Sequence, residues 1–389
     1  MASFDSKSPR TPKNLRTGAR VQADGFRWAQ ARLFGLGIDW QPKEDVYRLS
    51  ELRETSQLKE LRRGTLADCE KALLKTLEAR HGTGRMNLPF ATLGGKQFWA
   101  DEFIHLGWRV QRNVFTGHHR LLDPKDVRRA WGDFEACRVV FERQRIEKKL
   151  RADREHLVLL VHGLFRSKDS MSKMAGALRK AGFAVESVNY PSTRASIRTH
   201  ATQLRSILDR TLDYRSVSFV THSLGGIVVR ELLAIPQKQE WRERIQLGRI
   251  VMLAPPNQGS VVADALEKNI AYKLLAGDSG QELTPRALAN LPAPTCEFAV
   301  IAGGTGTDTG YNPILGGDND GTVLLKNTKL DGQKDFLRVR ALHSFIMNDE
   351  TAIAGCTHFL RKGKFPPASE ESAEGSDSSA EAESPAGAK

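Results

Sequence analysis

The residues with the clearest potential for chemistry surround Ser223. An apolar run typical of a strand leads into Thr221-His-Ser-Leu-Gly225, and a run typical of a helix follows it. A serine held at such a turn exposes its hydroxyl at a helix amino terminus, where a developing negative charge is stabilised. Ser223 is therefore the candidate nucleophile, although Thr221 stands where this turn usually has glycine. The competing interpretation is that Ser223 merely caps the helix.

A nucleophilic serine needs a general base, and His343 is the best placed histidine. It directly follows residues 336–342, which we predict to be the last strand. His358 is the rival, but it falls inside the last predicted helix. His162 and His222 belong to the turns around the proposed site, and we expect their backbone to matter more than their rings.

The supporting acid is expected in a loop between the serine and the histidine. Asp320 precedes Gly321, which suits a tight turn that points the carboxylate back towards His343. There it would fix the imidazole tautomer and stabilise the imidazolium. Asp318 is the alternative acid and Asp308 a weaker one. The resulting order along the chain is Ser, Asp, His.

A second turn could supply hydrogen-bond donors. The apolar run 157–161 ends in His162-Gly163, two predicted strands before the serine. Acyl transfer needs backbone N–H groups aimed at the oxyanion of the tetrahedral intermediate. We assign these donors to the N–H groups of Leu164 and Leu224. An ordinary strand-exit turn is the alternative interpretation of His162-Gly163.

Short apolar runs alternate with amphipathic stretches from His156 onwards, which predicts a doubly wound, mostly parallel α/β sheet covered on both faces. The expected strands are residues 157–161, 184–190, 217–220, 249–253, 298–301 and 336–342. The expected helices are residues 171–181, 197–211, 226–233 and 351–361.

The rest of the chain differs in composition from this α/β part. We predict a disordered basic amino terminus, a mostly helical aromatic-rich extension, the α/β domain and a disordered acidic tail, at residues 1–24, 25–152, 153–365 and 366–389. Within the extension, helices are expected at 66–80 and from Asp123-Pro124 to about residue 152, with Asp123 as the N-cap.

The net charge of +12 is unevenly distributed. Residues 365–389 hold six acidic residues and one lysine, so this tail carries −5 and the remainder +17. The positive charge of the remainder predicts at most weak association of the protein with an anionic membrane surface. Because no basic cluster lies in a nucleic-acid motif, we expect no nucleic-acid partner.

The cysteine pattern and the apolar runs of the sequence also bear on the cellular compartment of the protein. The four cysteines are scattered without a metal-binding pattern and are expected to be reduced thiols. The sequence contains neither an apolar run of membrane-spanning length nor a signal-peptide core. A cytoplasmic location is therefore expected, with an organelle transit peptide as the alternative.

Five motifs resemble those of bacterial lipase-like and esterase-like α/β hydrolases. They are Val161-His-Gly-Leu164, Thr221-His-Ser-Leu-Gly-Gly226, Ala254-Pro-Pro-Asn-Gln-Gly259, Asn319-Asp-Gly-Thr-Val323 and Leu342-His-Ser-Phe-Ile-Met347. The resemblance covers residues 156–365, a little over half of the chain. It implies the α/β-hydrolase fold and a Ser223–His343–Asp320 triad, with no cofactor and no metal.

In this family, an insertion such as residues 257–294 forms a cap over the serine. Its apolar residues would line an acyl-chain site, namely Val261, Val262, Leu266, Ile270, Tyr272, Leu274 and Leu275. A helix that merely packs on the domain is an equally good interpretation.

The expected function is hydrolysis of a carboxylic ester, with a lipid or another acyl ester as the small-molecule substrate, through an acyl-enzyme. One alternative is an acyltransferase, in which an alcohol replaces water. The other is a non-catalytic binding protein on the same fold, which would be expected to lack a triad residue.

Overall fold

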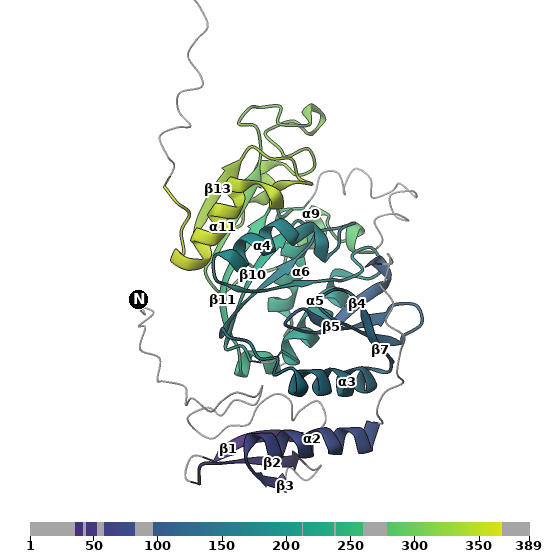
Figure 1. Cartoon of the computed structure of the whole chain (residues 1–389). Coiled ribbons are helices and arrows are strands. Elements are labelled where there is room, and N and C mark those ends of the chain that lie inside the picture. The colour runs from purple at the N-terminus through teal and green to yellow at the C-terminus, as the bar shows by residue number, and fades with distance from the viewer. Residues whose placement is uncertain are drawn as a thin grey trace, which may run out of the picture.

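A computed structural model describes residues 36–41, 44–52, 58–81, 96–211, 213–236, 239–259 and 278–367 of the chain (Figure 1). The predicted disorder of residues 1–24 lies outside the described residues, as does the predicted disorder of the tail beyond Pro367. The seven apolar residues expected to line a cap also lie outside them, in 260–277.

A six-stranded parallel sheet forms the centre of the molecule, which confirms the predicted fold class. The strands lie in the order β9-β8-β10-β11-β12-β13, and every neighbouring pair is parallel. They are β8 (His156–Val161), β9 (Ala184–Val188), β10 (Ser216–His222), β11 (Gln246–Leu253), β12 (Phe298–Gly303) and β13 (Asp335–Val339).

Helices cover both faces of this sheet, and they are α4 (Ser172–Lys180), α5 (Ile197–Asp209), α6 (Leu224–Ala234) and α11 (Glu350–Lys362). Successive strand residues point to opposite faces, so a strand between two helical layers must be apolar throughout. In β8, Leu157 and Leu159 pack with α5 and α6, whereas Val158 and Leu160 pack with α4 and α11. Figure 1 shows α11 beside β13, at the carboxyl end of the fold.

The strand order reverses between β8 and β10. From β8 the chain passes to β9 on one side, then returns to place β10 on the other side of β8. At such a switch point the loops leaving the two central strands diverge and open a crevice at their carboxyl ends, where ligands bind in α/β folds. The turns at Leu164 and Leu224 follow these two strands.

The amino-terminal region is not mostly helical, and the prediction is wrong on this point. Apart from the helices α2 (Leu66–His81) and α3 (Phe134–Glu147), the described part of residues 25–152 forms two antiparallel sheets. The first contains β1 (Leu36–Gln41), β2 (Val46–Leu52) and β3 (Leu58–Gly64). The second, called here the β4–β7 sheet, contains β4 (Trp99–His105), β5 (Trp108–Asn113), β6 (His119–Leu122) and β7 (Arg128–Gly132). Figure 1 shows α2 lying along α3.

The helix predicted to start at Asp123-Pro124 starts later, at Phe134, and the difference has a local cause. Asp123 does cap a turn, because its Oδ1 accepts from the N–H groups of Lys125 and Val127 at 2.9 and 3.0 Å. That turn leads into strand β7 and not into a helix. The helix begins at Phe134, where Asp133 Oδ1 accepts from Ala136 N–H at 2.7 Å. An Asp-Pro pair therefore marks a turn here, although it also fits a helix start.

The remaining elements are short. They are the α-helices α9 (Pro285–Leu288) and α10 (Leu325–Thr328) and 3-10 turns at Lys96–Phe98, Lys168–Met171, Glu240–Glu243, Pro313–Leu315 and Ile346–Asn348. The four cysteines are free thiols, as expected. Among the residues that the structure describes, no helix has the length and apolar character needed to cross a membrane.

Candidate active site

Ser223 occupies a strained turn between β10 and α6. Its φ is 51° and its ψ −122°, and a positive φ is uncommon for any residue other than glycine. Two hydrogen bonds hold the turn, from Ser223 N–H to Leu253 O and from Gly226 N–H to Ser223 O, both at 2.9 Å. Because α6 begins at Leu224, the serine lies at a helix amino terminus. Strain of this kind concentrates at functional sites.

Gly225 allows α6 to approach β8 closely. A Cβ at this position would lie 2.8 Å from His162 O and would also collide with Val161 O. Thr221, which replaces the usual glycine, is fully buried in β10 and pairs there with Val161 and Met252. The close approach that demands glycine therefore falls on Gly225, and the turn forms with threonine at position 221.

We expect Gly225→Ala to destabilise the fold by about 1–3 kcal/mol, because the added methyl group overpacks against two backbone carbonyls. A melting temperature several degrees below that of the wild type would report this change. Gly176→Ala in α4 is the matched control, because a Cβ there meets no atom within 4 Å. The control should be neutral or slightly stabilising, since alanine favours helix. Equal melting temperatures for the two variants would contradict the packing argument.

His343 and Asp320 lie next to the serine in a hydrogen-bonded chain. His343 Nε2 is 3.0 Å from Ser223 Oγ, and His343 Nδ1 is 2.7 Å from Asp320 Oδ2. Asp320 is buried, and its Oδ1 accepts from the N–H groups of Thr322 and Val323 at 3.0 and 2.8 Å. The N–H of His343 also donates to Asp320 O at 2.8 Å. The carboxylate can thus fix the tautomer in which Nε2 is free to accept the serine proton.

The rival residues lie elsewhere. Asp318 Oδ1 accepts from Thr305 N–H at 2.8 Å and its Oδ2 from Gly306 N–H at 3.0 Å, so this carboxylate holds a neighbouring turn. Asp308 is exposed. His358 lies in α11, where its Nδ1 bonds to Lys364 O at 2.7 Å.

Two features together decide the fold. The sheet order reverses once, and a strained serine turn follows β10 at the switch point, with Asp320 after β12 and His343 after β13. The chain has the α/β-hydrolase fold. The last strand of the sheet is shorter than expected, because β13 ends at Val339 and His343 lies in the following turn.

The loop after β8 lies directly against the serine. A Cβ on Gly163 would be 3.1 Å from Ser223 Cβ and 2.8 Å from His222 Nδ1, so glycine is required at this contact. Leu164 follows this glycine, and Leu224 is the first residue of α6, whose N–H has no acceptor within the helix. Leu164 and Leu224, the residues expected to supply the oxyanion donors, thus follow two neighbouring strands.

Two histidine rings make contacts that the sequence did not predict. His222 Nε2 is 3.0 Å from His343 O, and burial together with the neighbouring His343 holds the pKa of His222 well below its usual range. His222 is therefore neutral and donates to that carbonyl. Burial likewise lowers the pKa of His162 to about 4, and its Nδ1 bonds to Gly163 O at 2.8 Å. We expected the backbone of these residues to matter more than their rings, and the structure adds these two ring contacts to the site.

Residues 129–277 match a family model described as a domain of unknown function, DUF7379. No curated protein matches the chain.

Solved structures similar to the chain include a lipase and a carboxyl esterase. The Bacillus licheniformis lipase BlEst2 is 21% identical, with a TM-score of 0.41 over 51% of this chain and 88% of that one. The metagenomic carboxyl esterase MGS0156 is 18% identical, with a TM-score of 0.38 over 50% and 67%. The lin2722 product of Listeria innocua is 16% identical, with a TM-score of 0.39 over 54% and 95%. The fold assignment rests on the strand order and the serine turn and not on these likenesses.

Proposed function

We propose that this protein is a serine hydrolase that cleaves carboxylic esters with an apolar acyl group. The observation that supports the proposal is the chain of contacts from Ser223 Oγ to His343 Nε2 at 3.0 Å and from His343 Nδ1 to Asp320 Oδ2 at 2.7 Å. A nucleophile, a base within hydrogen-bond reach and a group that orients the base are the parts that covalent acyl transfer needs.

In the proposed reaction His343 Nε2 takes the proton of Ser223 as Oγ attacks the ester carbonyl carbon. The carbonyl oxygen becomes an oxyanion and accepts hydrogen bonds from the N–H groups of Leu164 and Leu224. The carbon–oxygen bond to the alcohol then breaks, and the imidazolium returns its proton to the departing oxygen. Water, deprotonated by the same histidine, attacks the acyl-enzyme and releases the acid and free Ser223.

Exposed apolar side chains beside the site favour an apolar acyl group. Phe165 lies in the loop after β8, called here the oxyanion loop (residues 162–167), and is 55% exposed. Leu342 and Phe345 flank His343 and are 43% and 59% exposed. Such large apolar groups are normally buried, so their exposure around one site indicates contact with an apolar ligand. A lipid or another acyl ester meets this requirement.

A panel of esters of one leaving group and increasing acyl length tests this proposal. Each methylene that becomes buried contributes about 0.8 kcal/mol, so kcat/KM should rise by up to about fourfold per methylene over the first few members. Phe345→Ser should flatten this rise, whereas Leu58→Ser, which alters an exposed apolar residue on β3, should leave it unchanged.

Two results would count against the proposal. Absence of cleavage across the panel would oppose ester hydrolysis, and a profile independent of acyl length would oppose an apolar acyl site. Release of free acid without an added alcohol distinguishes hydrolysis from acyl transfer to an acceptor.

A further inference from the structure

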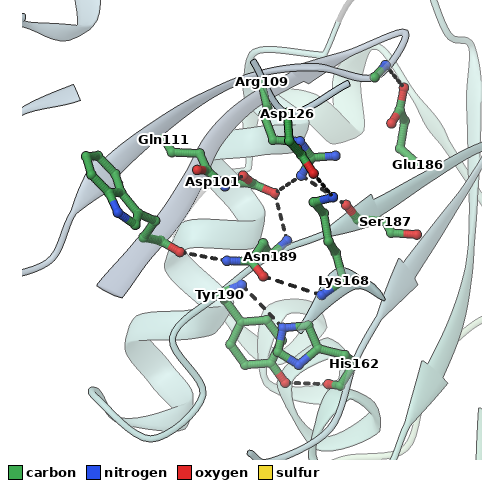
Figure 2. Close-up of polar contacts among 12 residues, drawn as sticks. Asp101, Arg109, Gln111, Asp126, His162, Lys168, Glu186, Ser187, Asn189 and Tyr190 are labelled. Atoms are coloured by element: carbon green, nitrogen blue, oxygen red, sulfur yellow. Dashed lines mark hydrogen bonds and ion pairs between the residues drawn. The ribbon is translucent and has the colours of Figure 1, made fainter. Parts of the chain in front are cut away.

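The β4–β7 sheet contains a buried acidic residue that is bound to the α/β domain. Asp101 of β4 is 0% exposed. Its Oδ2 accepts from Arg109 Nη1 at 2.6 Å and from Asn189 N–H at 2.7 Å, and its Oδ1 accepts from Gln111 Nε2 at 2.7 Å. Its own N–H donates to Asn189 O at 2.9 Å. Asp101 thus bonds to both the backbone N–H and the backbone C=O of Asn189, the residue that follows β9 (Figure 2).

Asn189 extends these contacts in two directions. Its Nδ2 donates to Trp99 O of β4 at 2.9 Å. Its Oδ1 accepts from Lys168 N–H at 3.3 Å, and Lys168 lies just beyond the oxyanion loop. The side chain therefore joins the β4–β7 sheet to the end of that loop, and Figure 2 shows it between Asp101 and Lys168.

Tyr190 follows Asn189 and contacts the oxyanion loop itself. Its hydroxyl donates to His162 O at 2.6 Å, and its N–H donates to His162 Nε2 at 3.4 Å. The two rings stack with their centroids 4.2 Å apart and an interplanar angle of 13°. Figure 2 shows this pair below Asn189, so the contacts run from Asp101 through Asn189 and Tyr190 to His162.

The ring of His162 fixes the orientation of one peptide group. Because Nε2 accepts from Tyr190 N–H, Nδ1 carries the proton and donates to Gly163 O at 2.8 Å. In a trans peptide the C=O and the following N–H point in opposite directions. The carbonyl of Gly163 faces the His162 ring, so the N–H of Leu164 points away from it. Leu164 N–H is the donor assigned to the oxyanion.

Other residues of the amino-terminal region hold the same loop. Gln97 Nε2 donates to Arg166 O at 2.6 Å. Asp126, in the turn between β6 and β7, pairs with Lys168 Nζ at 2.8 Å. Two direct contacts from the amino-terminal region thus reach the segment that follows His162, in addition to the indirect path through Asn189 and Tyr190.

We propose that the β4–β7 sheet is a positioning element for the oxyanion loop, and that Asp101 and Tyr190 are positioning residues that aim the N–H of Leu164. This inference rests on the proposed function for its catalytic consequence. Neither residue touches the reacting atoms; each acts through His162. The β4–β7 sheet is in this sense part of the catalytic unit.

Two variants and a control test the proposal in the full chain. Tyr190→Phe removes only the hydroxyl bonded to His162 O and keeps the ring stack. Asp101→Asn keeps the side-chain shape but removes the negative charge, which weakens the hydrogen bond from Asn189 N–H to this side chain. Glu102→Gln is the control: it alters the next residue of the same strand. The Glu102 carboxylate pairs with Arg112 at 2.6 Å, with His119 at 3.3 Å and with Arg210, which follows α5, at 3.4 Å, and in the described structure it bonds to neither Asn189 nor His162.

We expect both test variants to lower kcat by about 10-fold to 100-fold with little change in KM, since loss of one oxyanion donor costs about 10²–10³ in kcat. Affinity for an alkyl boronic acid, which forms a tetrahedral adduct with the serine, should fall in parallel. Amide hydrogen exchange should become faster in peptides that cover residues 162–168. Glu102→Gln should match the wild type in all three measurements.

The measurements separate failure of this inference from failure of the proposed function. Wild-type exchange rates at 162–168 in both test variants overturn the inference, whatever the activity. Raised KM with unchanged kcat and boronate affinity also overturns it. If the wild type cleaves no ester while exchange still accelerates, the positioning role stands and the proposed function falls. If Asp101→Asn fails to fold, Tyr190→Phe decides the question.

Discussion

Replacing Ser223 with alanine is expected to reduce kcat for ester cleavage by about 10⁶, because the nucleophile of a Ser-His-Asp set cannot be replaced by its neighbours. The backbone turn should survive, since its two hydrogen bonds run through Ser223 N–H and Ser223 O and not through the hydroxyl. The variant should therefore show an unchanged melting temperature. Steady-state kinetics on purified protein, together with thermal unfolding, measure both effects.

Covalent labelling gives a second readout for the same change. A fluorophosphonate should modify wild-type protein at Ser223 and leave Ser223→Ala unlabelled. Ser172→Ala, an exposed serine at the start of α4, is the control and should behave like the wild type. Labelling at another serine, or residual activity near that of the wild type, would contradict the assignment of Ser223.

The second large effect is expected at Asp320. In Asp320→Asn, Oδ1 can still accept from Thr322 N–H and Val323 N–H, so the amide NH₂ would face His343 Nδ1. The imidazole would then keep its proton on Nε2 and could not accept the proton of Ser223. We expect kcat to fall by about 10⁴ with the fold intact.

Asp318→Asn is the matched control for this variant. Asp318 is two residues away, and its carboxylate bonds to the 305–306 turn and not to the histidine. A small loss of activity is expected, together with some loss of thermal stability. Equal losses in the two variants, or a larger loss for Asp318→Asn, would reverse the roles assigned to the two carboxylates.

The central sheet was predictable because its signal is local. Its inner strands lie between two helical layers, so runs such as 157–161 are apolar at every position. The relative order of Ser223, Asp320 and His343 also follows from the sequence, and the structure brings the three side chains together. The end of β13 could not be predicted, because apolar residues recur at Ala341 and Leu342 after the strand has ended at Val339.

The contacts beyond the three side chains were not predictable, because they join distant segments. Asp101 and Asn189 are 88 residues apart, and in the sequence Asp101 is one acidic residue in an aromatic stretch. Asp318 and Asp320 differ in role because Thr305 and Gly306 return to bind the former. A single sequence contains no record of such long-range pairing.

His222 connects three loops at once, and this has a consequence for turnover. Its Nε2 bonds to His343 O, its ring lies so close to Gly163 that a Cβ there would collide with it, and its chain neighbour is Ser223. The loops bearing the proposed base, nucleophile and oxyanion donor are therefore packed together before any substrate arrives. The conformational entropy of aligning them is lost once, when the chain folds, and not again in each catalytic cycle.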